Sequence, residues 1–213
     1  ERGAMFWGIP MAGTTYGLSA TTGNGQNSNN KDTRVDGFEY TGRGTVNFAE
    51  IMGNSDAVYH IGAAASYVKL PKSSSQLLAN TNALRTEPRG INFIQALPTF
   101  GSVAGVDNDI ERTRYGLEAA VAQGPFKFQA EWLRNQFKGD ITTTRNFNDH
   151  MDAWYVEALW LITGEHYADA YKDGAFGNIK PKNDFVHPGA IGSGAYGAWE
   201  VGVRYSRLDA KDF

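Results

Sequence analysis

The chain of 213 residues contains no cysteine. A disulfide framework, a thiolate-bound metal and a cysteine nucleophile all need a thiol, so all three are excluded. The absence leaves the cellular compartment open, because many secreted bacterial proteins also lack cysteine.

An excess of charge of one sign is also lacking. Lys and Arg number 20 and Asp and Glu 23, which gives a net charge of −3 and a pI of about 5.8. A nucleic-acid-binding chain normally carries a clear basic excess, so we expect no nucleic-acid partner.

Long apolar runs are missing as well, since no segment approaches the roughly 20 apolar residues of a transmembrane helix. The mean hydropathy is −0.42. Neither observation excludes a membrane β-barrel, in which only alternate residues of each strand face lipid.

Residue patterns that would carry catalysis or bind a metal do not stand out. His150 lies near Asp149 and Asp152, but no third ligand follows at a matching spacing. The acidic segment 106–112 lacks the glycine and the spacing of a calcium-binding loop. No ordered Ser-His-Asp set and no carboxylate pair rises above chance, so we expect no enzyme, no cofactor and no metal site.

What the chain does contain is a regular alternation of apolar and polar residues. In GFEYTGRGTVNFAE (residues 37–50), the aromatic side chains and Val share one parity, while Glu, Thr, Arg and Asn share the other. The segment 113–137 repeats this pattern twice around Gly124 and Pro125. A period of two predicts strands with one apolar and one polar face, and the Gly-Pro pair predicts a tight hairpin turn.

The segment AWYVEALWLITGE (residues 153–165) obeys the same rule but contains a carboxylate. Burying Glu157 unpaired in an apolar core would cost several kcal/mol. Trp154 and Trp160 lie on the opposite parity from Glu157. We therefore predict that the carboxylate and the two indoles point to opposite sides of one strand.

About eight strands are expected, with little helix, so the fold class is predicted to be all-β and antiparallel. The expected strands fall within 14–23, 37–50, 57–70, 91–97 (a weak one), 113–123, 126–137, 153–162 and 197–209. Polar loops are expected at 22–36, 71–89, 139–149 and 167–196.

Alternation alone leaves two architectures open. Trp154 and Trp160 are separated by roughly 15 Å of membrane height on a tilted strand, which fits the ~25 Å apolar band of a membrane barrel. A soluble β-sandwich alternates in the same way, with its apolar face packed on a second sheet.

Three blocks of sequence resemble the phosphate-selective porins O and P of Gram-negative outer membranes in their order and spacing. The blocks are YGLEAAVAQGPFKFQAEWLR, WYVEALWLITGEHYADAYKDGAFGNIKPKNDF and GAWEVGVRYSRLD. The segments GRGTVNF and YHIGAAASY are similar to the preceding strand pair of that family. The resemblance spans roughly residues 15–209 and is weakest in the loops.

The resemblance implies a sixteen-stranded barrel in the bacterial outer membrane, in contact with lipid and lipopolysaccharide and usually trimeric. Its lumen would pass phosphate or other small anions without a cofactor. On this basis residues 1–213 are expected to form one partial transmembrane β-barrel domain that lacks N- and C-terminal strands. ERGAMF resembles the end of the constriction-loop region, and Phe213 is expected to lie in a loop.

If the apolar parity faces lipid, the opposite parity faces a watery lumen, where Glu157 would be hydrated and paired. Arg and Lys there would offer donors to phosphate, and Glu would keep the anion from binding too tightly. The candidate pore-lining residues are Arg43, Arg85, Arg114, Lys127, Glu157, Glu200 and Arg204, of which Arg85 rests on the resemblance of LRTEPRG to an Arg-bearing loop.

The inward charges counted on these strands balance, because Glu118 and Glu131 share the same parity. Phosphate selectivity therefore rests on the resemblance alone, and each Arg could instead brace the wall through a Glu partner. Three functions stay open: a passive anion channel of the outer membrane, a soluble all-β binding module, and a small structural barrel of about eight strands.

Overall fold

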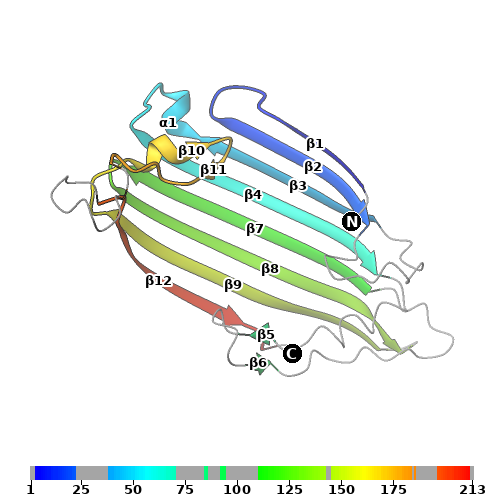
Figure 1. Cartoon of the computed structure of the whole chain (residues 1–213). Coiled ribbons are helices and arrows are strands. Elements are labelled where there is room, and N and C mark those ends of the chain that lie inside the picture. The colour runs from blue at the N-terminus through cyan, green and yellow to red at the C-terminus, as the bar shows by residue number, and fades with distance from the viewer. Residues whose placement is uncertain are drawn as a thin grey trace.

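The computed structural model describes residues 3–22, 38–70, 84–85, 92–94, 110–142, 145–183, 185 and 196–211. Eight antiparallel strands form one curved sheet in the order β1-β2-β3-β4-β7-β8-β9-β12 (Figure 1). Each strand of this sheet pairs with the next one along the chain, so the sheet is a meander. The predicted all-β, antiparallel fold class is confirmed.

The strands of the main sheet are β1 (Gly3–Gly8), β2 (Thr14–Thr22), β3 (Phe38–Asn47), β4 (Ala57–Leu70), β7 (Ile110–Gln123), β8 (Phe126–Thr142), β9 (Arg145–Leu161) and β12 (Glu200–Asp209). The shorter elements are α1 (Phe48–Ile51), η2 (Tyr167–Ala170), and the strand pairs β5 (Leu84–Arg85) with β6 (Asn92–Ile94) and β10 (Tyr171–Lys172) with β11 (Ala175–Phe176). Within the described part of the chain, no helix is long and apolar enough to cross a membrane.

The alternation predicts the strands best where one face is apolar. β4 occupies the predicted 57–70, and the β7–β8 hairpin turns at Gly124, whose φ is 54°. Two expectations are wrong: residues 139–149 are mostly strand, and residues 3–8 form β1 rather than the end of a loop. The weak strand expected within 91–97 is present as β6, which pairs with β5 in a separate two-stranded sheet.

Polar cross-strand contacts stabilise β8 and β9 where these strands approach and enter the predicted loop 139–149. Gln136 on β8 donates a hydrogen bond to Asn148 on β9 at 2.7 Å, and Arg134 binds both carboxylate oxygens of Asp152 at 2.8 Å. Pairing thus continues beyond the point where the apolar residues stop, which hydrophobic alternation cannot predict.

The two faces of the main sheet differ in the way the sequence predicts. Trp154, Trp160 and Trp199 are 36%, 46% and 58% exposed, so none of them lies in a sealed core. The side chains that point to the same side of the sheet as these three Trp residues form the outer face. The alternate side chains form the inner face, and residues 163–183 cover one end of it. We call residues 163–183 the inner segment.

Apolar side chains hold the inner segment against the sheet. Val58, Ala122 and Leu161 project from three strands onto the inner face and pack around Tyr167, and each of the four is 1% exposed. This small core explains why Leu161 falls on the polar parity of β9: another part of the chain covers it.

The inner segment contains a two-residue hairpin between β10 and β11. Asp173 and Gly174 have φ values of 52° and 79°, as the type I′ turn requires. The tip stays on the inner face and reaches β3, where a Cβ on Gly174 would lie 2.6 Å from Oγ1 of Thr45. The hairpin thus crosses the inner face toward β2 and β3 (Figure 1).

Candidate functional site

The structure brings six of the seven predicted pore-lining residues to the inner face. These are Arg43, Arg114, Lys127, Glu157, Glu200 and Arg204. Cross-strand register places Arg43 opposite Ala64, and Glu157 opposite Arg204. Arg85 belongs to β5, which pairs with β6 and not with a strand of the main sheet, and its side chain lies outside the described residues.

Arg43 joins the wall to the inner segment. Its Nε and Nη2 donate to one carboxylate oxygen of Glu118, at 3.1 and 2.5 Å, and Nη2 also donates to the carbonyl of Gly174 at 3.0 Å. His60 lies 3.2 Å from the same Glu118 oxygen, and its Nδ1 lies 2.7 Å from the hydroxyl of Tyr171. His60, which belongs to no motif in the sequence, thus takes part in a network with Arg43, Glu118 and Tyr171.

A glycine makes room for the network. Gly62 lies directly opposite Glu118 in the β4–β7 register, and a Cβ at this position would collide with the Glu118 carboxylate. Only a residue without a side chain therefore allows Glu118 to lie flat on the inner face between Arg43 and His60.

Lys127 lies on the inner face but beneath the inner segment. Lys127 is 9% exposed, and its Nζ lies 4.7 Å from the ring centroid of Phe176 and 5.2 Å from that of Tyr167. Cation–π attraction of this kind is strongest where water is excluded. Lys127 therefore anchors the inner segment through its charge.

The far edge of the inner face carries a second set of paired charges. Arg204 lies over the ring of Tyr155 at 3.7 Å and reaches Glu157 at 3.9 Å. The Tyr167 hydroxyl donates to Glu200 at 2.7 Å. These contacts match the wall-bracing alternative, although Arg204 remains 43% exposed and reachable from the inner side.

Two arginines share one carboxylate at the end of the strands that the inner segment does not cover. Arg112 donates to one oxygen of Glu39 at 3.1 Å, while Arg114 donates to the other oxygen and to Ser66 at 2.9 Å. Glu39 is nearly buried, whereas the Arg114 side chain is 47% exposed. The sequence count of inward charges omitted Glu39 and Arg112, so it missed this cluster and its local excess of one positive charge.

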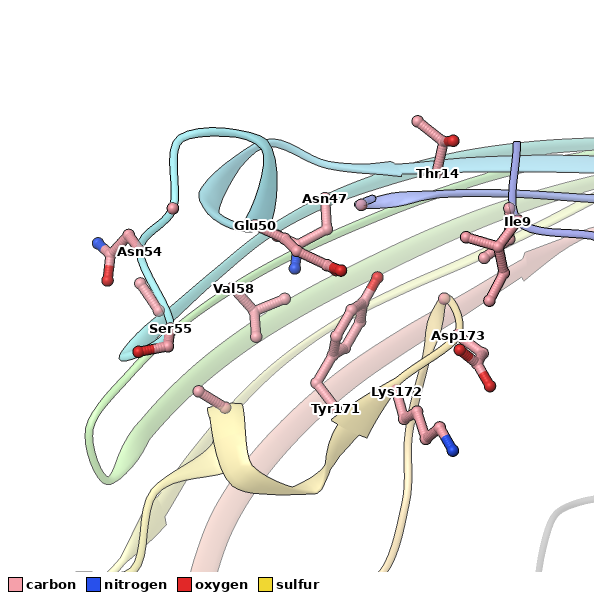
Figure 2. Close-up of a pocket in the computed structure, with 16 residues that line it drawn as sticks. Ile9, Thr14, Asn47, Glu50, Asn54, Ser55, Val58, Tyr171, Lys172 and Asp173 are labelled. Carbon is pink, nitrogen blue, oxygen red and sulfur yellow. The ribbon is translucent and has the colours of Figure 1, made fainter. Parts of the chain in front are cut away.

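Cavities flank the inner segment on both sides. One of about 310 Å³ lies between the segment and the wall and is lined by Arg43, Lys127, Glu131 and Phe176, among others. Another of about 470 Å³ lies toward α1, with Glu50, Asn54, Tyr171 and Asp173 around it (Figure 2). The segment therefore leaves space on either side instead of sealing the inner face.

Three ionisable groups of the inner segment, Glu165, Tyr167 and Tyr171, have shifted pKa values. A hydrogen bond from Thr163, followed by the backbone N–H of Lys182 at 3.1 Å, lowers the pKa of Glu165. Burial, with Glu50 as a further cause, raises the pKa of Tyr171 to about 12, and burial raises that of Tyr167 also. No group of three potential metal ligands occurs in the described ranges.

The outer face shows a slanted boundary between apolar and charged side chains. Along β12 from Glu200, the first charged residue on the outer face is Arg207. Cross-strand pairing extends the row of Arg207 through Trp154 on β9, Trp132 on β8 and Leu117 on β7 to Ala63 on β4. The first charged outer residue of β4 is Lys69, six residues further along. The boundary thus moves about 1.5 residues, or ~5 Å, per strand, which corresponds to a tilt of about 45° for strands ~4.8 Å apart.

Comparison with known families agrees with this geometry. The family model described as phosphate-selective porin O and P matches residues 3–213. The chain belongs to this family. Among curated relatives of the porin O and P family, Porin O of Pseudomonas aeruginosa is 29% identical over 116 residues. That alignment covers 54% of this chain and 24% of Porin O, so the chain matches less than two thirds of its relative's length.

Proposed function

We propose that this chain is part of an outer-membrane porin, a passive diffusion channel that favours small anions such as phosphate. The single observation that carries the proposal is the sidedness of the sheet. Rings and aliphatic side chains cover the outer face, while ionised groups line the inner face. A passive pore requires this distribution, and it points to a channel rather than an enzyme.

The slanted boundary of the outer face supports the membrane location. Barrel strands tilt by about 35–45° from the barrel axis, so a level membrane surface cuts neighbouring strands at shifted residues. The slope of about 45° deduced from Arg207 and Lys69 is close to this range. A soluble binding module has no reason to keep such a level apolar band exposed.

A lumen wider than that of a small barrel is the second part of the proposal. Eight closed strands leave an interior that side chains fill. Here the inner face already accommodates a whole chain segment and cavities of about 310 and 470 Å³ beside it. Within the described strands β1 and β12 are opposite edges and do not pair. We therefore propose that the chain belongs to a single transmembrane domain whose barrel is closed by further strands. On the family's pattern the closed barrel has sixteen strands in total.

Anion preference rests on Arg112, Arg114 and Glu39. Two guanidinium groups share one carboxylate, so a unit of positive charge and several Arg114 donors remain for a passing oxyanion. Two long connections of the main sheet, 23–37 and 71–109, leave from this same end of the strands, whereas a third, 162–199, leaves from the opposite end and contains the inner segment. Because the third connection folds back onto the inner face, we take the end with 23–37 and 71–109 as the extracellular one, where long loops lie in outer-membrane barrels, and this puts the Arg pair near the entrance for external anions.

Reversal potentials in planar bilayers test the proposal directly. Full-length protein should conduct, and under a salt gradient it should favour the anion. Arg114→Gln should lower the anion-to-cation permeability ratio by about twofold and Glu39→Gln should raise it, since one unit charge ~8 Å from the ion path contributes about 0.5 kcal/mol in water. Lys138→Gln, which removes a cation from the outer face, is the matched control.

Two results would contradict the proposal. One is the lack of conductance from folded full-length protein, and the other is cation selectivity that neither Arg114→Gln nor Glu39→Gln changes. We extend the proposal to a homotrimer in contact with lipopolysaccharide. A heat-resistant trimer on gels of the detergent-extracted protein is the expected result, and a monomer under mild conditions would remove the trimer from the proposal.

A further inference from the structure

A group of charged residues on the outer face has no part in the channel. It consists of Arg134, His150, Asp152, Arg207, Asp209 and Lys211, and we call it the outer collar. Register places Arg134 opposite Asp152, and Asp152 opposite Asp209. All six residues share the outer face with the Trp132–Trp154 pair and lie at or just beyond it along the strands.

The collar contains more positive than negative charge. Asp152 and Asp209 face each other directly across β9 and β12, an arrangement that repels unless cations intervene. Arg134 binds Asp152 through two bonds of 2.8 Å, while Lys211 and Arg207 lie 2.8 and 3.9 Å from Asp209. Three permanent cations thus stand against two carboxylates.

Donors of the collar remain available to a ligand. The side chains of Arg207 and Lys211 are 55% and 78% exposed, and both lean on the single carboxylate of Asp209. Arg offers five N–H donors and Lys three, more than one carboxylate can accept. An oxyanion with several acceptor oxygens would satisfy the remaining donors of both residues.

On β7, β8, β9 and β12, the described residues at the opposite end of the outer face include no such group. The last outward-facing cross-strand row at that end consists of Gln123, Phe126, Trp160 and Val201. None of these is charged, and the rings of Phe126 and Trp160 stack at 6.0 Å. The two ends of the apolar band are therefore built for surfaces of different chemistry.

We infer that the outer collar binds the phosphate of a phosphorylated lipid headgroup, in the leaflet at the end of the strands from which connections 23–37 and 71–109 leave. This inference rests on the proposed membrane location. Aromatic residues lie at the membrane interface. One cross-strand row beyond Trp132 and Trp154 corresponds to roughly 5 Å of height on a tilted strand, which is headgroup depth. Free phosphate in the lumen cannot reach the collar, because the sheet wall separates the two.

Lipid binding to detergent-purified full-length protein, measured by native mass spectrometry, tests the inference. The probes are a diphosphorylated lipid A and its dephosphorylated counterpart. The Arg207→Gln/Lys211→Gln double variant should bind the diphosphorylated lipid about thirtyfold more weakly, at about fivefold per cation removed. The affinity of wild type for the dephosphorylated lipid should be as low as the affinity of the double variant for the diphosphorylated lipid. Lys180→Gln, which removes an exposed cation from the inner segment, should bind both lipids like wild type.

Either of two outcomes overturns the inference: equal affinity of the double variant and wild type for the diphosphorylated lipid, or equal affinity of wild type for both lipids. Conductance of the same preparations separates this inference from the proposed function. Wild type and double variant should conduct equally, so unchanged lipid binding in a conducting protein rejects the collar alone. A folded protein that does not conduct rejects the porin itself.

Discussion

Arg43 shows how one side chain can link the main sheet to the inner segment that lies on it. Its guanidinium group reaches both the Glu118 carboxylate and the Gly174 carbonyl, which lie on different elements. Such a bridge needs several donors in a fixed plane, which Lys cannot supply.

Replacing Arg43 by Lys should therefore loosen the hairpin although the charge is kept. We expect a loss of about 1–2 kcal/mol in the local stability of residues 171–176, because charge-assisted hydrogen bonds are broken. Faster amide hydrogen exchange in these residues would report the loss. Arg207→Lys on the outer face is the control, and equal exchange in both variants would show that Arg43 does not hold the hairpin.

Glu165 gives the inner segment a dependence on acid pH. The residue is 4% exposed, and the hydrogen bond from Thr163 and the Lys182 N–H keep its folded pKa below the ordinary value. A depressed pKa means that the charged form stabilises the fold at pH above the unfolded value of about 4.3. This contribution is lost as the pH falls through the lower, folded pKa.

Amide protection factors at Lys182 should accordingly fall with pH only below about 4.3. In Glu165→Gln the protection should be lower at neutral pH and independent of this titration, because no carboxylate is left to protonate. A wild-type protection factor that stays constant as Glu165 protonates would contradict the assignment.

At the scale of elements, the inner segment decides how much of the inner face is open. Its hairpin tip packs against Thr15 and Thr45 with a positive φ at Gly174. A side chain there would both strain the turn and collide with Thr45.

Gly174→Ala should therefore displace the hairpin and raise the single-channel conductance of the full-length protein. Asp173→Gly is the matched control, since it relaxes the neighbouring positive φ of 52° without adding atoms and should leave conductance unchanged. Conductance in Gly174→Ala equal to or below that of wild type would mean that the hairpin does not narrow the path.

The strands that carry one apolar face were predictable from sequence, whereas the inner segment was not recognised. Period two locates β4 and the β7–β8 hairpin because burial of alternate residues selects for it. Two signals of the inner segment were nevertheless present. Leu159 and Leu161 interrupt the polar parity of β9, and the Lys172-Asp173-Gly174 run matches a type I′ hairpin turn.

Parity predicted which charges share the inner face, but not how they pair. Arg43 and Glu118 lie on strands separated by β4, so their contact depends on sheet curvature and on the empty space at Gly62. The burial of Lys127 depends on a segment some 40 to 50 residues further along the chain. Relations of this kind exist only in three dimensions.

At the scale of the whole molecule, one division accounts for composition and structure together. The chain is nearly neutral and has a low mean hydropathy, yet alternation over eight strands gives its sheet one apolar face and one charged face, as the proposed pore requires. The slanted boundary, the inner charge pairs and the outer collar each depend on that division.

Single-cysteine labelling along β9 measures the division most directly, and these 213 residues contribute no cysteine of their own to the background. Full-length variants Val156→Cys, Glu157→Cys and Ala158→Cys would be reconstituted in liposomes and exposed to a water-soluble thiol reagent and to a lipid-phase quencher. Our account predicts that position 157 reacts with the reagent, while positions 156 and 158 resist it and are quenched from the lipid. Equal reactivity at the three positions, or the reverse alternation, would contradict it.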